Sequence, residues 1–172
     1  QRAAVGDYSA MENYFVRFPF QLGYVLYSEI FFRVAGTFIP GLPDGYYCLA
    51  LQGVNLLWLL LCYHALIRIS LYIYSSMRIQ KLTALLLFFC FPAVLSCTFL
   101  YGNIPAFSCG TVAVWMFLAF LNRKRLKYAL VFAAAMTLAV VLKLNLLIFA
   151  LAIAIVWVFD VIRTRSVKSL IC

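Results

Sequence analysis

A charged interruption divides the longest apolar stretch of the sequence. Residues 128–159 are apolar almost throughout, but Lys143-Leu144-Asn145 breaks the run near its middle. A single helix over this stretch would be about 48 Å long at about 1.5 Å per residue, whereas the hydrocarbon core of a bilayer is about 30 Å thick. The stretch is therefore predicted to form two short membrane helices that meet at Lys143, just below one membrane surface.

A lysine at that depth has two interpretations. Charged groups inside a membrane are energetically costly and are typically paired or functional, so Lys143 is a candidate functional residue. Alternatively, the side chain extends to the lipid headgroups and buries only its aliphatic part. The local sequence favours neither interpretation over the other.

The composition excludes a water-soluble globular domain. The 172 residues are 67% hydrophobic and 11% charged, whereas soluble domains carry about 25% charged residues. The apolar runs are long and lack the alternation of β-barrel strands. The sequence thus predicts an all-α fold, a polytopic transmembrane helical bundle in a lipid bilayer.

The positive charge indicates membrane topology, and we expect no nucleic-acid partner. The net charge is +9, and the basic residues lie in short segments between apolar runs. Such segments face the cytoplasm in most membrane proteins. We therefore assign to the cytoplasm the clusters Arg78 with Lys81, Arg123–Lys127 and Arg163–Lys168.

Two regions are expected along the chain. Residues 1–46 are predicted to form an outer-face loop followed by a juxtamembrane helix over Leu22–Gly36, in which Glu29 and Arg33 pair one turn apart; a membrane crossing is the alternative for this helix. Residues 37–46 are expected to be a loop, and the basic segment 68–81 is expected to connect the first two spans. Residues 47–172 are expected to hold about five spans: 47–67, 82–101 with a kink at Pro92, 104–121, and the two that meet at Lys143.

The spans also contain polar residues without an evident chemical role. Gln52 and Asn55 share one helical face and are predicted to join helices by hydrogen bonds. The six cysteines form no CxxC pair, and there is one histidine, His64. We interpret the cysteines as small core residues and expect no metal site, although the sequence leaves a divalent metal open as a cofactor.

The predicted topology gathers the remaining polar residues on the outer face. With the basic clusters inside, the N-terminal region, the turn at 101–105 and the break at Lys143 all lie outside. The polar residues so placed are Asp7, Glu12, Arg17, Gln21, Tyr101, Asn103, Lys143 and Asn145.

Such a face suits a lipid-linked phosphate. Lys143 could bind the phosphate as a point charge, and Arg17 could bind it through two hydrogen bonds. In sugar transfer the phosphate is the leaving group, and cations that stabilise its developing charge lower the barrier. A carboxylate is needed to accept the proton of the acceptor hydroxyl, and Asp7 or Glu12 could supply it.

Three segments resemble the outer loops of one enzyme family. Residues 14–23, YFVRFPFQLG, the turn at 101–105, YGNIP, and residues 142–149, LKLNLLIF, are together similar to the GT-C class of bacterial membrane glycosyltransferases. These enzymes are related to the dolichyl-phosphate-mannose protein mannosyltransferases. The chain resembles the N-terminal part of such an enzyme.

The resemblance implies a function and a location. It implies a polyprenyl-phosphate-linked sugar as donor, a glycan, lipid or protein as acceptor, and an active face on the outside of the bacterial plasma membrane. The family carries aspartate where this chain has Asn103, and its catalytic aspartate would precede Gln1, which leaves Asp7 as the candidate base. The residues expected to bind substrate are Arg17, Gln21, Tyr101, Asn103, Lys143 and Asn145.

Two other functions compete with sugar transfer. A lipid or solute transporter, or a flippase, would use broken helices of the kind expected near Lys143 and Pro92. A non-catalytic membrane assembly subunit would use the aromatic-rich helix faces for packing.

Overall fold

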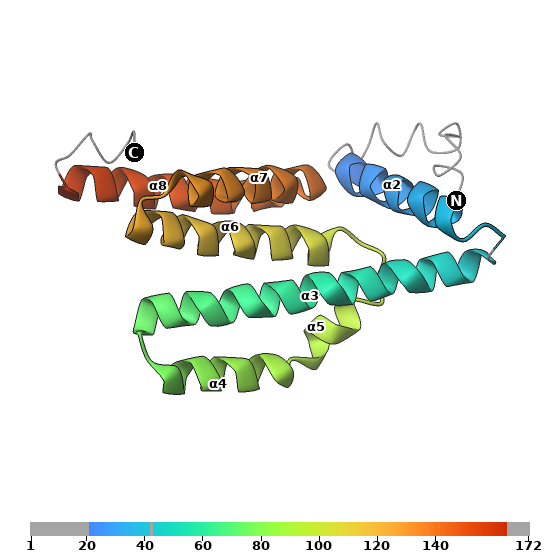
Figure 1. Ribbon diagram of the computed structural model, residues 1–172, viewed down its shortest axis with the longest axis horizontal. Helices are drawn as coiled ribbons and strands as arrows, with labels where there is room; N and C mark the ends of the chain where they lie inside the picture. Colours follow the sequence, from blue (N-terminus) through green and yellow to red (C-terminus); the bar gives the residue numbers. More distant parts are fainter. Residues whose placement is uncertain (1–20, 42, 165–172) are drawn as a thin grey trace.

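The computed structural model describes residues 21–41 and 43–164, which form seven α-helices and no strand (Figure 1). The predicted all-α class is therefore confirmed. In chain order the elements are α2 (Leu22–Phe38), α3 (Asp44–Tyr74), α4 (Met77–Phe88), α5 (Phe91–Ser96), α6 (Asn103–Arg123), α7 (Leu126–Leu142), a 3-10 turn (Leu144–Leu146) and α8 (Leu147–Thr164).

The helices identify the chain as a membrane protein. Among the described residues, three segments are long and apolar enough to cross a bilayer: Gly45–Tyr74, Asn103–Arg123 and Leu144–Ile162. Leu126–Leu142 is a shorter apolar helix. The expected number of five spans stays a prediction, as does the juxtamembrane position of α2.

Helices α3 and α6 lie side by side and run in the same direction. Successive contacts join Trp58 O to Ser108 Oγ at 2.7 Å and Cys62 Sγ to Thr111 Oγ1 at 3.6 Å. Helix α7 packs against α6 through a core that includes Ala106, Cys109 and Ala139. Small side chains let the two backbones approach closely, which membrane helices use in place of the hydrophobic effect.

The predicted end of the first span at Ile67 is wrong, because α3 continues to Tyr74. The Arg68 guanidinium lies 5.9 Å from the ring centre of Trp115 on α6. This cation–π contact accommodates a charged residue within α3. Helix α3 ends where Ser75 adopts a left-handed conformation, with φ at 48°. It also begins at Asp44, so the expected boundary between residues 46 and 47 falls within this helix.

The predicted span at 82–101 is two helices instead of one kinked helix. Helix α4 ends at Phe88, and α5 begins at Phe91 with Pro92 in its first turn. Proline fits the first turn of a helix because it has no N–H to satisfy there, and inside a continuous helix it would remove a hydrogen bond. Pro92 thus accounts for a break.

The predicted interruption at Lys143 is confirmed as a break between α7 and α8. Lys143 has an extended backbone, with φ at −155° and ψ at 108°, and the 3-10 turn follows it. Helix α8 then returns along α6 with most of its side chains exposed; among those described, only Ile153 is fully buried, and Phe149 and Trp157 are partly buried against the core. At its far end Asp160 forms an ion pair with Lys124 at 3.5 Å.

Candidate functional site

Three segments that are distant in the sequence meet at one end of the bundle. They are the start of α2, the turn before α6, and the break after α7 (Figure 1). Gln21 Nε2 donates a hydrogen bond to the Tyr101 hydroxyl at 2.6 Å. Lys143 Nζ donates one to Asn103 Oδ1. Four of the residues expected to bind substrate therefore form two bonded pairs.

The other expected site residues are not joined to these pairs. Asn145 is exposed in the 3-10 turn that follows the break, and no hydrogen bond described for this part of the chain joins it to Lys143 or Asn103. Asp7, Glu12 and Arg17 lie outside the described residues. Their proposed roles in proton transfer and phosphate binding stay predictions.

Two glycines allow the three segments to approach at close backbone contact. A Cβ atom at Gly23 would overlap with the backbone carbonyl of Val141, so α2 crosses the end of α7 at backbone contact. A Cβ atom at Gly102 would lie 3.1 Å from both Leu142 O and Tyr24 Cβ. Because Gly23 leaves no room for a Cβ atom and Gly102 leaves little, close packing constrains the position of Lys143 relative to α2 and α6.

The electrostatics of this junction favour an anion. Asn103 is the first residue of α6, so its N–H and that of Ile104 have no acceptor within the helix. Pro105 has no N–H, and Ala106 N bonds to Gly102 O at 3.1 Å. The positive end of the α6 dipole and the half-buried Lys143 ammonium therefore lie together.

The carboxylates whose side chains are described are engaged elsewhere. Glu29 forms the predicted ion pair with Arg33, at 2.8 Å. Asp160 pairs with Lys124 at the opposite end of the bundle. Over the described ranges there is also no group of three or more His, Cys, Asp and Glu residues that could hold a metal ion. The junction thus offers cationic and hydrogen-bonding groups rather than acids.

Sequence reasoning missed a second polar cluster behind the junction. The Trp58 indole donates a hydrogen bond to the Tyr27 hydroxyl at 3.0 Å. The Tyr24 hydroxyl and Asn55 Oδ1 are buried and have no hydrogen-bond partner among the described residues. Burial raises the pKa of both tyrosines, so their hydroxyls stay protonated at neutral pH. The spacing of Tyr24 and Tyr27 on one face of α2, next to Gly23, was the available signal.

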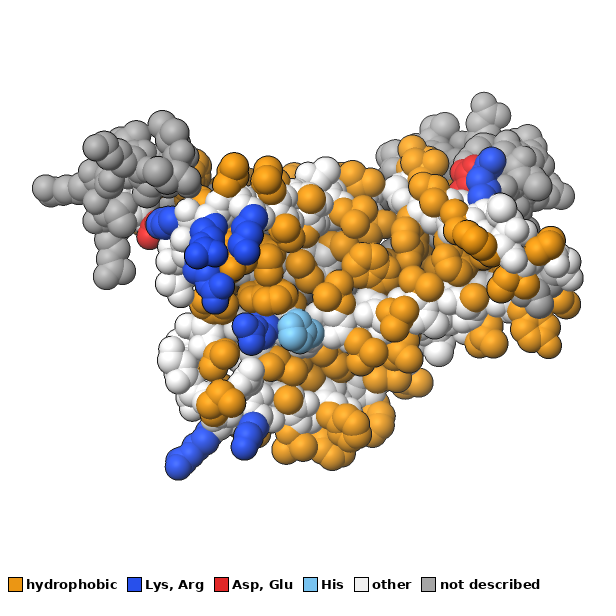
Figure 2. All heavy atoms as spheres, viewed as in Figure 1, with side chains coloured by type: hydrophobic (Ala, Val, Ile, Leu, Met, Phe, Trp, Pro, Cys, Tyr) orange, Lys and Arg blue, Asp and Glu red, His pale blue; other side chains and the backbone are white. Residues whose placement is uncertain are grey.

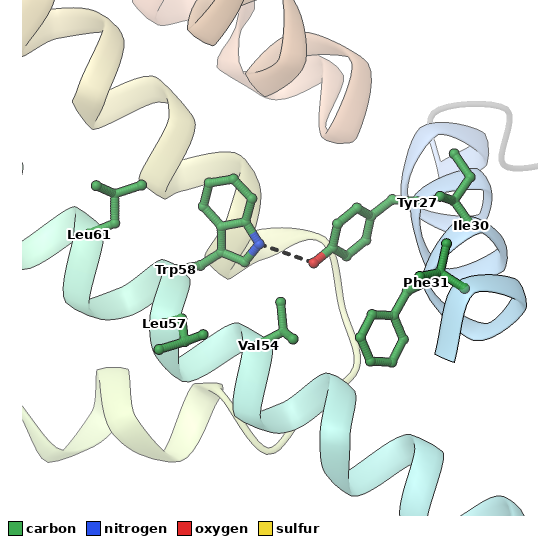
Figure 3. A pocket seen from close by; sticks show the side chains of 8 residues that line it. Tyr27, Ile30, Phe31, Val54, Leu57, Trp58 and Leu61 are labelled. Carbon is green, nitrogen blue, oxygen red and sulfur yellow. Dashed lines mark hydrogen bonds between the residues drawn. The ribbon is translucent and has the colours of Figure 1, made fainter. Parts of the chain in front are cut away.

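An apolar groove lies between α2 and α3 (Figure 3). It encloses about 560 Å³, and the Trp58–Tyr27 hydrogen bond crosses it. Its walls are the side chains of Tyr27, Ile30, Phe31, Val34, Val54, Leu57, Trp58 and Leu61.

Comparison with protein-family models, with curated proteins and with solved structures finds no match for this chain. Function is therefore inferred from its residues and their geometry.

Proposed function

We propose that the chain is a segment of an integral membrane glycosyltransferase that moves a sugar from a polyprenyl-phosphate donor to an acceptor on the outer face. The observation that carries this proposal is the position of Lys143. Its ammonium lies at a helix break, bonded to Asn103, where the first N–H groups of α6 have no acceptor within the helix.

This arrangement suits a phosphate that leaves with the lipid. Lys143 would bind one phosphate oxygen, and the N–H groups of Asn103 and Ile104 would bind another. As the bond from sugar to phosphate breaks, negative charge grows on these oxygens. The fixed N–H groups and the Lys143 ammonium stabilise this charge more in the transition state than in the bound lipid-linked sugar. Tyr101 and Gln21 would contact the sugar or the acceptor.

We expect the proton acceptor to be none of the carboxylates whose side chains the structure describes. Glu29 and Asp160 are paired with cations, and Asp160 lies at the far end of the bundle. The acceptor hydroxyl would lose its proton to Asp7 or to the aspartate that the family resemblance places before Gln1. Asp7→Asn tests the first of these possibilities.

Transfer of labelled sugar from a polyprenyl-phosphate donor tests the proposal on the full-length protein in liposomes. Lys143→Ala should lower kcat/KM by about 100-fold, because a preorganised donor to the developing charge is lost. Lys81→Ala, which removes an exposed cation from α4, is the matched control. Full turnover by Lys143→Ala at normal protein level would contradict the proposal.

A lipid flippase is the second candidate, favoured by two helix breaks. One break, at Phe89 and Cys90, separates α4 from α5, and the other begins at Lys143 and separates α7 from α8. Transporters place substrate sites at discontinuous helices of this kind. Movement of a labelled lipid across the bilayer without a new covalent product would favour the flippase over the transferase.

A further inference from the structure

Basic residues gather at the end of the bundle opposite Lys143. Figure 2 shows Lys and Arg side chains concentrated at one end of the molecule, with hydrophobic side chains over the middle. They come from the second half of α3, the start of α4, the end of α6, the turn that follows it and the start of α7. The residues are Arg68, Arg78, Lys81, Arg123, Lys124, Arg125 and Lys127.

Two of these arginines are held along the seam between α3 and α6. Arg68 lies over Trp115, and the ring of His64, one turn earlier on α3, lies 5.4 Å from the same indole. Arg123, the last residue of α6, donates a hydrogen bond to the Tyr128 hydroxyl on α7 at 2.8 Å. Tyr72, one turn after Arg68 on α3, has a weaker interaction with the same guanidinium. Among the described residues no ion pair joins either arginine to a carboxylate. The seam therefore has positioned cations without an anion.

The face of α3 that carries Arg68 continues into the apolar groove. Leu57, Leu61, His64, Arg68 and Tyr72 follow one another at intervals of three or four residues, so they share one face of the helix. Leu57 and Leu61 line the groove. From Arg68 to Leu57 the helix rises about 16 Å, close to half of a hydrocarbon core of about 30 Å.

We propose that this face binds an anionic phospholipid, with its phosphate between Arg68 and Arg123 and an acyl chain lying past His64 into the groove between α2 and α3. Two observations favour a lipid over a free anion. The cations lie beside Trp115, Tyr72 and Tyr128, aromatic residues of the kind found at membrane interfaces. The apolar side chains that continue the same face of α3 would gain nothing from a soluble phosphate.

Native mass spectrometry of the protein in detergent tests this site with phosphatidylglycerol and phosphatidylcholine as probes. We expect phosphatidylglycerol to bind at least tenfold more tightly, and R68Q/R123Q to remove most of that preference. R78Q/K81Q, which removes the same charge from α4, should retain it. R68Q removes the contact with Trp115 and could disturb the fold, so R123Q alone serves as a second test. Arg123 is exposed, and its replacement by itself should also lower the preference for phosphatidylglycerol.

The length of the lipid tests the groove separately. Leu57→Trp narrows the groove at an exposed position, and it should weaken binding of long-chain phosphatidylglycerol while leaving a six-carbon analogue unchanged. Inorganic phosphate should not displace the long-chain lipid. Equal binding of both headgroups, an equal loss in the two double variants, or displacement by inorganic phosphate would overturn the proposal.

Discussion

Lys143 and Asn103 are separated by 40 positions in the sequence and are joined by a side-chain hydrogen bond. The bond connects the end of α7 to the first residue of α6. It holds a cation where α7 ends and α6 begins, so the junction is both a structural contact and the centre of the candidate site.

Replacing Asn103 should change stability in a direction that depends on the new side chain. Asn103→Ala removes the acceptor of the Lys143 ammonium and should lower the free energy of unfolding by about 1 to 2 kcal/mol. Asn103→Asp replaces a neutral acceptor by a charged one and should raise it by about 1 kcal/mol. Thermal unfolding in detergent measures both, with Asn122→Ala, exposed near the other end of α6, as the control. An unchanged melting temperature for Asn103→Ala would show that the bond contributes nothing.

The crossing of α2 and α7 should not tolerate a side chain at Gly23. A methyl group there meets Val141 O, so Gly23→Ala should destabilise the protein by about 1 to 3 kcal/mol. Gly36→Ala is a control on the same helix, because a methyl group at that position would have no neighbour within 4 Å, and it should be neutral or stabilising by up to about 1 kcal/mol. Equal effects of the two substitutions on unfolding would argue against the close crossing.

Asn55 should be the more important of the two predicted hydrogen-bonding residues on α3. Its buried Nδ2 donates to Cys97 O at 3.3 Å and Phe99 O at 3.4 Å, whereas the half-buried Gln52 donates to Thr98 O at 2.9 Å. Asn55→Ala leaves buried carbonyls unpaired and should lower the free energy of unfolding by about 1 to 3 kcal/mol. Gln52→Ala should lower it by less, since water can reach its partner; the reverse order would contradict this account.

The two ends of the bundle should be accessible from opposite sides of the membrane. Asn145 and Arg125 are both exposed, one beside the helix break and the other in the basic turn. In a protein whose native cysteines are replaced, Asn145→Cys should react with an impermeant maleimide on intact cells. Arg125→Cys should react only after permeabilisation. Labelling of both positions from one side would refute the assigned topology.

The charge pattern predicted the meeting of distant segments better than it predicted individual helices. Alternating spans place Tyr101 and Lys143 at one end whatever the exact helix boundaries, so Gln21, Tyr101, Asn103 and Lys143 could be grouped in advance. The pairing of Lys143 with Asn103 could not, because the register of α6 against α7 depends on close packing at Ala106 and Ala139.

The predicted helix boundaries were wrong where contacts between helices, rather than the local sequence, accompany the observed structure. The charge of Arg68 suggests the end of a span, yet α3 continues through it, and Trp115 on another helix lies beneath its guanidinium. Tyr24 was missed as a neighbour of the site for a similar reason: its position depends on the contact between Gly23 and Val141, which no local pattern reveals.

Because α8 makes few contacts with the rest of the bundle, the geometry of the candidate site should depend on membrane thickness. This helix has 18 residues and spans about 27 Å, slightly less than a hydrocarbon core of about 30 Å. Lys143 precedes one end, and the ion pair between Asp160 and Lys124 anchors the other. Most of its side chains are exposed, so in a bilayer lipid tails would surround much of its length. A thicker or thinner bilayer would then act on its tilt and strain these attachments. The geometry around Lys143 would then vary with the acyl-chain length of the host membrane.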